Sequence, residues 1–153
     1  MTTNEYANNS QNNFENRATP QSQSRRGIFV FPNGDKYDGE YIVTEQGKIQ
    51  RQGQGKHIGQ DGLVYDGQWR NDLMNGRGLL THDDGSQYDG EFVDNYFQGQ
   101  GTYSWTDGAK YTGKFVGSKA EGEAEYQGPQ LGFVPFIGQA NGQEATLRYK
   151  ITS

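Results

Sequence analysis

The 153-residue sequence predicts an all-β protein in which the strands form a single-layer, elongated antiparallel sheet of tandem hairpins. Three observations lead to this prediction: a repeat of fixed period, alternation of aromatic and polar residues within it, and a turn sequence in each unit. The composition agrees. A hydrophobic content of 31% is low for a thick core, whereas 23 glycines and 13% aromatic residues are high.

Two short phrases that share one spacing mark the repeat. Tyr-x-Gly-x-aromatic begins at residues 37, 65, 88 and 111, and Gly-x-Gly begins at residues 53, 76, 99 and, with alanine in its last place, 122. Successive starts are 23 residues apart, except that the first two tyrosines are 28 apart, so five additional residues lie between Tyr41 and Gly53. The repeat positions that we expect to be structural are Tyr37, Gly39, Tyr65, Gly67, Gly76, Gly78, Tyr88, Gly90, Gly99, Gly101, Tyr111 and Gly113.

The local chemistry of each unit predicts strand, turn and strand. Tyr88 to Phe92 has its rings and its glycine at alternate positions with acids between them, the pattern of a strand with one covered and one solvated face. Asn-Gly or Asp-Gly pairs begin at residues 33, 61, 84 and 107, and they supply the positive φ that tight hairpin turns require. We therefore expect a meander of antiparallel neighbours.

The strand glycines allow two interpretations, both structural. Rings of neighbouring strands can lie across the bare glycine backbone, or glycine can permit a β-bulge or a strong twist. We favour the first, because each phrase places a ring two residues from its glycine on the same face.

Two parts of the chain differ in composition. Residues 1–26 are rich in Asn, Gln and Ser and predict a disordered tail, because they cannot bury enough surface to offset chain entropy. Residues 27–153 form the repeat domain: a half repeat at 27–36, repeats starting near 37, 65, 88 and 111, and a degenerate cap at 134–153. We expect roughly 8 to 10 strands with atypical ends.

The phrases, in register over about residues 27–126, resemble the MORN (membrane occupation and recognition nexus) repeat. The resemblance implies a single-layer sheet of hairpins that serves as a non-catalytic scaffold or adaptor. It also implies a place in ciliary or flagellar structures, sperm structures, phagosome-associated machinery or cytoskeletal anchoring. Ala124 departs from the second glycine of Gly-x-Gly, so the fourth repeat is expected to pack differently.

We expect a protein partner, supplied by a helix, a strand or a second copy of the chain as a homodimer, to bind across the aromatic face. Aromatic side chains give large, rigid contact areas and are enriched in interface hot spots. The absence of cysteine and of a signal-peptide pattern leads us to expect a cytoplasmic location, including ciliary, cytoskeletal or vesicle-associated sites. The residues predicted to bind the partner, taken as matching positions of successive strands, are Phe29, Phe31, Trp69, Tyr103 and Trp105.

A lipid-binding module is the main alternative. Lys48, Arg51 and Lys56 around the insertion are the candidate residues, since binding to anionic lipid needs clustered basic side chains. From residue 27 onward, 11 basic against 17 acidic residues give a net charge of −6, which disfavours anionic lipid and nucleic acid. We therefore expect no nucleic-acid partner and only weak membrane contact.

No catalytic site, cofactor or metal is expected. His57 and His82 lie at positions that carry rings in other repeats, so we interpret them as ring substitutes and not as metal ligands. Gly53-x-Gly55-x-x-x-Gly59 lacks the spacing of a dinucleotide fingerprint, and Asp83-Asp84-Gly85 lacks a full calcium loop. The acids of the phrase alternate with rings and predict a solvated face; they are Asp38, Glu40, Asp66, Asp89 and Glu91.

Overall fold

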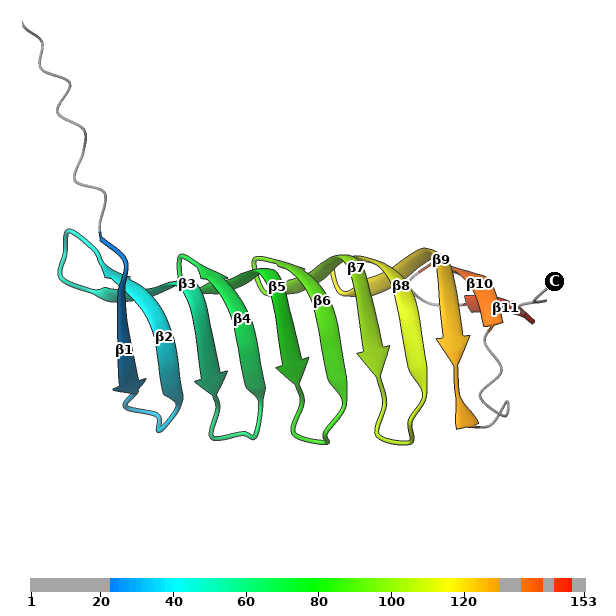
Figure 1. Cartoon of the computed structure of the whole chain (residues 1–153), viewed down its shortest axis with the longest axis horizontal. Helices are drawn as coiled ribbons and strands as arrows, with labels where there is room; N and C mark the ends of the chain where they lie inside the picture. Colours follow the sequence, from blue (N-terminus) through cyan, green and yellow to red (C-terminus); the bar gives the residue numbers. More distant parts are fainter. Residues whose placement is uncertain (1–22, 130–135, 142–144, 150–153) are drawn as a thin grey trace, which may run out of the picture.

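The computed structural model describes residues 23–129, 136–141 and 145–149, and Figure 1 shows them as one row of hairpins. The strands are β1 (Arg25–Val30), β2 (Lys36–Val43), β3 (Ile49–Ile58), β4 (Val64–Arg70), β5 (Leu73–Thr81), β6 (Gln87–Val93), β7 (Tyr96–Ser104), β8 (Lys110–Val116), β9 (Lys119–Gln127), β10 (Phe136–Asn141) and β11 (Ala145–Tyr149). They form one sheet in sequence order, and each neighbouring pair is antiparallel. The predicted single-layer meander is confirmed.

Two kinds of turn connect the strands. At one end of the strands, the Asn-Gly and Asp-Gly turns have glycine at φ between 87° and 90°, as the sequence predicts; these are Gly34, Gly62, Gly85 and Gly108. At the other end of the strands, two-residue turns place both residues at positive φ, as at Asp94 (47°) and Asn95 (72°) in the β6–β7 hairpin. Such turns match the right-handed twist of the strands, which keeps the hairpins in register.

The five additional residues lengthen the β2–β3 hairpin. Its turn runs from Thr44 to Lys48, where the N–H of Thr44 donates to the Lys48 carbonyl at 2.9 Å. The Lys48 N–H also donates to the Thr44 hydroxyl at 3.1 Å. The extra length therefore forms a longer loop at the ends of β2 and β3 and leaves the pairing of β3 with β4 regular (Figure 1).

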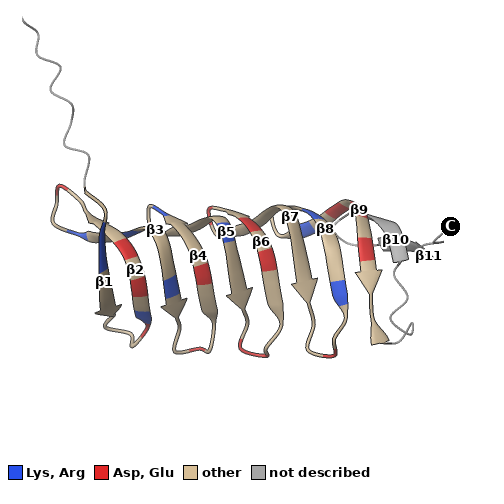
Figure 2. Ribbon diagram, viewed as in Figure 1, with Lys and Arg blue, Asp and Glu red and all other residues tan. Residues whose placement is uncertain are grey.

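The sheet has two chemically different faces. In β6 and β8 the motif tyrosine, glycine and phenylalanine are buried and the residues between them are exposed. We call the side with the tyrosines the aromatic face and the opposite side the polar face. Figure 2 shows charged residues on the strands from β1 to β6 and on β8 and β9, and β7 has none. The acids predicted to form a solvated face lie on the polar face.

One row of small residues crosses the sheet on the aromatic face. Cross-strand partners join Gly27 to Gly39, and the row continues through Gly55, Gly67, Gly78, Gly90, Gly101, Gly113 and Ala124 to Gly138. Because each of these residues but Ala124 lacks a side chain, a trough of bare backbone runs from β1 to β10. The tyrosine rings lie in this trough.

The other glycines of the Gly-x-Gly phrase have a different role. Gly53, Gly76, Gly99 and Gly122 have φ between 65° and 78°. They lie where the register shifts between β2 and β3, β4 and β5, β6 and β7, and β8 and β9. Thus the first glycine of each phrase serves a β-bulge, and the second, where it is glycine, serves ring packing. Both sequence interpretations hold, each at its own position.

Three sequence expectations need correction or fall outside the described residues. The tail was predicted to extend to residue 26, but Arg25 and Arg26 belong to β1, because they pair with Tyr41 and Glu40. The described strands number 11, one above the predicted range, because the cap supplies two strands in addition to the nine of the repeats. Residues 1–22 of the predicted tail and parts of the cap lie outside the described residues.

Candidate functional site

The tyrosine of each motif lies over glycine backbone of its own strand and of the next one. A Cβ added at Gly67 or Gly78 would lie only 2.5 to 2.6 Å from atoms of the Tyr65 ring or its hydroxyl. Tyr37 and Tyr88 cover the equivalent glycine pairs in their repeats. Tyr37, Tyr65 and Tyr88 are at most 1% exposed, although no second layer covers the described sheet.

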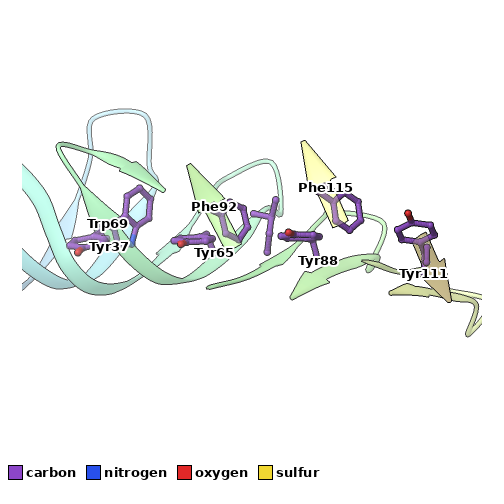
Figure 3. Packing of buried hydrophobic residues seen from close by; sticks show 9 residues of the cluster. Tyr37, Tyr65, Trp69, Tyr88, Phe92, Tyr111 and Phe115 are labelled. Atoms are coloured by element: carbon purple, nitrogen blue, oxygen red, sulfur yellow. The ribbon is translucent and has the colours of Figure 1, made fainter. Parts of the chain in front are cut away.

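A second set of rings fills the spaces between the tyrosines. Trp69, Phe92 and Phe115, the last residues of the motifs, stand between successive tyrosines in Figure 3. Phe92 makes edge contacts with Tyr65 at 5.0 Å and Tyr88 at 5.2 Å between ring centroids. The alternation of flat and upright rings produces a core one ring deep along the sheet.

The structure separates the five residues predicted to bind a partner. Trp69 is only 5% exposed, and its indole N–H donates to the Gly55 carbonyl at 2.9 Å. It is the equivalent of Phe92 and not of Tyr103, so the expected match in position with the other four residues is wrong. Trp69 is a core residue with almost no surface for a partner.

The other four predicted residues lie on the aromatic face in two groups. Phe29 and Phe31 are half-buried at the β1 end. Tyr103 of β7 and Trp105, just after that strand, lie further along the sheet, with ring centroids 4.9 Å apart, and Trp105 is 43% exposed. The sheet therefore presents two aromatic sites.

The group around Trp105 is extended by two neighbouring rings. The ring centroid of Tyr126 lies 6.2 Å from that of Trp105, and the ring centroid of His82 lies 6.1 Å from that of Tyr103. We call His82, Tyr103, Trp105 and Tyr126 the ring strip. Tyr126 was not predicted as a partner-binding residue, yet it follows Tyr103 by one period of 23 residues, and that spacing was the available signal.

The ring strip is held in place by polar contacts. The Tyr103 hydroxyl is 2.9 Å from the Ser86 hydroxyl, which is itself buried. The N–H of Trp105 donates to the Ala109 carbonyl at 2.9 Å in the β7–β8 turn. The strip is therefore a fixed surface of rings, in which one large side chain is substantially exposed.

At the β1 end, Arg51 takes the place of an apolar core residue. Its equivalents one and two periods later are Met74 and Phe97, both packed against the core. The Arg51 guanidinium lies 4.0 Å from the centroid of the Trp69 ring and donates to Asp72 at 3.1 Å. The charge of Arg51 is thereby paired within the aromatic face.

An open cleft of about 400 Å³ lies beside Arg51. His57 lines it, with Nδ1 at 3.4 Å from the Arg51 guanidinium and Nε2 at 3.5 Å from the Asp35 carboxylate. Burial, and then the nearby Arg51 charge, lower the pKa of His57. The other lining residues are Phe31, Pro32 and Asn33.

The two histidines are ring neighbours on the aromatic face. His57 lies 6.4 Å from Phe31 and 6.1 Å from Trp69, and His82 lies against Tyr103. Within residues 23–129, 136–141 and 145–149, no three His, Cys, Asp or Glu side chains form a group that could hold a metal ion. No helix in that part of the chain is long and apolar enough to cross a membrane.

The structure does not bring the three candidate lipid-binding residues together. Arg51 lies on the aromatic face, paired with Asp72. Lys56 lies on the polar face between its cross-strand neighbours Asp38 and Asp66, and Lys48 ends the β2–β3 turn. The carboxylates next to Lys56 and Arg51 offset the positive charge that binding of an anionic lipid headgroup would need.

The repeats of this sheet match a known family. A model of the MORN repeat matches residues 24–36, 65–87 and 88–110. This match supports the MORN repeat family. The matched MORN units at 65 and 88 begin at the predicted tyrosines, and the unmatched stretches include the insertion before Gly53 and the Ala124 departure. A search of curated proteins gave no match.

Proposed function

We propose that this protein is a non-catalytic scaffold or adaptor that binds a protein partner across the aromatic face of its sheet. MORN repeats are a non-enzymatic repeat module, and a one-layer sheet has no second layer to cover this face. The observation that carries the proposal is the exposure of Trp105, 43%, between the rings of Tyr103 and Tyr126.

The ring strip has the properties of an interface hot spot. Large aromatic side chains lose few rotatable bonds on binding, and Trp and Tyr are enriched among residues that dominate binding energy. The strip spans the end of β5 to β9, so a partner segment would cross several strands. An amphipathic segment with apolar side chains toward Trp105 fits this surface, whether a helix, a strand or a second copy supplies it.

The test compares the partners of wild-type protein and of Trp105→Ala by proximity labelling in ciliated, germ and phagocytic cells. Tyr96→Ala is the matched control, because Tyr96 is 59% exposed but lies on the polar face. We expect Trp105→Ala to weaken partner recovery by about tenfold or more and Tyr96→Ala to leave it unchanged. Equal recovery by wild type and a Trp105→Ala protein of unchanged melting temperature would contradict the proposal.

The alternatives have separate tests. A lipid module should bind vesicles containing phosphoinositide in a salt-sensitive way that fails on charge reversal at Lys48, Arg51 and Lys56. The separation of these residues in the sheet disfavours that outcome. A self-assembling structural protein should sediment as a dimer or a larger species.

The cellular setting is proposed from the resemblance. The phrases FPNGDKYDGEY and GAKYTGKF, together with the insertion, resemble the short vertebrate MORN repeat-containing protein 2. On that basis we propose a cytoplasmic role in ciliary, flagellar, sperm or phagosome-associated assemblies. Imaging of the tagged chain in these cell types tests the proposal, and exclusion from all of these structures would contradict it.

A further inference from the structure

The first strand of the sheet is the second half of an incomplete repeat. Gly27 pairs with Gly39, and Phe29 pairs with Tyr37, as Gly101 pairs with Gly113 and Tyr103 with Tyr111 in the β7–β8 pair. The MORN model likewise matches only 13 residues here, 24–36, against 23 in each of the other matched units. β1 therefore corresponds to β3, β5, β7 and β9.

Each of those four strands has a Tyr-x-Gly-x-aromatic strand on its preceding side, and β1 has no described strand there. The tyrosine of the preceding strand lies over the second glycine of Gly-x-Gly, as Tyr88 of β6 does over Gly101 of β7. At Gly27 the nearest atoms to an added Cβ belong instead to Phe29 and Tyr41, of β1 and β2, at 3.1 Å. The equivalent of the covering tyrosine is missing from the described sheet.

The polar face of β1 is also unusual. Ile28 and Val30 are 77% and 68% exposed, the highest values among large hydrophobic residues of the described chain. Their equivalents in β7 are Thr102 and Ser104, which pair with Asp89 and Gln87 of β6. The edge of β1 that pairs with no described strand thus presents two exposed aliphatic side chains, where the equivalent positions of β3 and β5 have one each and those of β7 have none.

We propose that the edge of β1 that pairs with no described strand binds an extended strand of a protein partner with the pattern apolar-Tyr-apolar-Gly-x-aromatic. The tyrosine would displace the Phe29 and Tyr41 rings that cover Gly27 in this structure, and the two apolar residues would lie beside Val30 and Ile28. Main-chain hydrogen bonds along an open sheet edge supply affinity, and alternate side chains supply specificity. This edge is separate from the ring strip and does not rest on the proposed function.

The sequence of residues 1–22 does not contain the pattern proposed for this edge. Phe14 precedes Arg25 by the 11 residues that separate the two phrases in the later repeats. However, Asn16 and Ala18 then stand at the glycine and ring positions, so a side chain would lie where the tyrosine needs bare backbone. A second copy also lacks a free motif strand, because β2, β4, β6 and β8 are paired on both sides.

The test is amide hydrogen exchange of the full chain with a peptide that contains Val-Tyr-Val-Gly-Glu-Phe. We expect the amides of Arg25–Val30 to exchange at least about tenfold more slowly with saturating peptide, and amides of the interior strands to be unchanged. A control peptide with Gly→Val should give no protection, because its side chain occupies the place of the tyrosine ring.

Protein variants make the assignment specific. The double change Ile28→Lys/Val30→Lys should abolish protection, whereas Val93→Lys, at an exposed position of the polar face, should not. Trp105→Ala should leave peptide binding intact, which separates this proposal from the one for the ring strip.

Several outcomes would overturn the proposal. Equal protection by the Gly→Val peptide would show that binding to this edge does not require the glycine of the pattern. Slow exchange of β1 without peptide that disappears on deletion of residues 1–22 would identify the tail as the occupant. Sedimentation as a dimer that the Ile28→Lys/Val30→Lys change dissociates would identify a second copy.

Discussion

At the residue scale, the four motif tyrosines differ in what their hydroxyl groups contact. Those of Tyr37, Tyr65 and Tyr88 donate to the backbone carbonyl three residues further on, Tyr65 at 2.9 Å. The Tyr111 hydroxyl is buried and has no hydrogen-bond partner. Ala124 explains the difference, because its methyl group takes the place of the second glycine, and in Figure 3 the Tyr111 ring is tilted out of the row.

This difference predicts unequal costs for removing a hydroxyl. Tyr65→Phe should lower the free energy of unfolding by about 1 kcal/mol, because it removes the part-buried hydrogen bond that the phenol donates to the Gln68 carbonyl. Tyr111→Phe should change it by less than about 0.5 kcal/mol or raise it, because no bond is lost. Urea unfolding of both variants checks the pair, and an equal loss in the two would refute our account of Ala124.

The glycines beneath the rings predict a second effect at this scale. Gly101→Val should displace the Tyr88 ring and lower the free energy of unfolding by about 1 to 3 kcal/mol, the range for overpacked cores. Gln100→Ala, one residue away and exposed, is the control and should be close to neutral. A thermal melt of Gly101→Val that matches wild type would show that the ring does not need bare backbone.

At the scale of elements, successive hairpins are joined by a contact that recurs every 23 residues. The N–H of Asn95, in the β6–β7 turn, donates to the Met74 carbonyl at 3.0 Å, and the Met74 N–H donates back to the Asn95 side chain at 2.8 Å. The same exchange joins Asp72 to Arg51 and Ser118 to Phe97. Each turn thus binds the start of the preceding hairpin's second strand.

The contact predicts graded effects at Asn95, whose φ is 72°. Asn95→Gly keeps the conformation and removes one hydrogen bond, so it should lower the free energy of unfolding by about 0.5 to 1.5 kcal/mol. Asn95→Ala should cost more, since alanine is also strained at positive φ. Chemical denaturation of the two variants provides the measurement. If Asn95→Gly cost more than Asn95→Ala, the account would be wrong, because alanine would then not be penalised by the positive φ at this position.

At the scale of the whole molecule, the described protein is a sheet whose core is a line of rings. Its sequential strands contact mainly their neighbours, as in other repeat proteins, so stability is a sum of repeat and interface contributions. Burial raises the pKa of Tyr37 and Tyr88 to about 12, and it also raises the pKa values of Tyr65 and Tyr111. The core is therefore sensitive to alkaline conditions as a unit.

The sign of this pH dependence follows from the proton balance. Tyrosine in an unfolded chain has a pKa of about 10, so above that pH the unfolded state loses protons that the folded state keeps. The stabilisation is complete below about pH 10 and is lost as pH rises toward the folded values of about 12 for Tyr37 and Tyr88. The urea midpoint should fall as the pH rises from about 10 to about 12. A constant midpoint over that range would contradict burial of the phenols.

The sequence by itself determined the strands, the turns and the single-layer meander. Period and local chemistry were sufficient because each repeat specifies its own hairpin: alternation sets the faces of Tyr88–Phe92, and Asp107-Gly108 sets a turn. It also indicated that rings lie over glycine. These features depend on residues close together in the chain.

Only the tertiary structure decided which rings are core and which are surface. Trp69 and Trp105 are both tryptophans of the repeats, yet one is 5% and the other 43% exposed. The difference arises because Trp69 lies between two tyrosines of neighbouring repeats, whereas Trp105 begins the turn that joins β7 to β8 at the ends of these strands. Burial of a ring depends on its contacts with the neighbouring hairpins, and the residue spacing within one repeat does not specify those contacts.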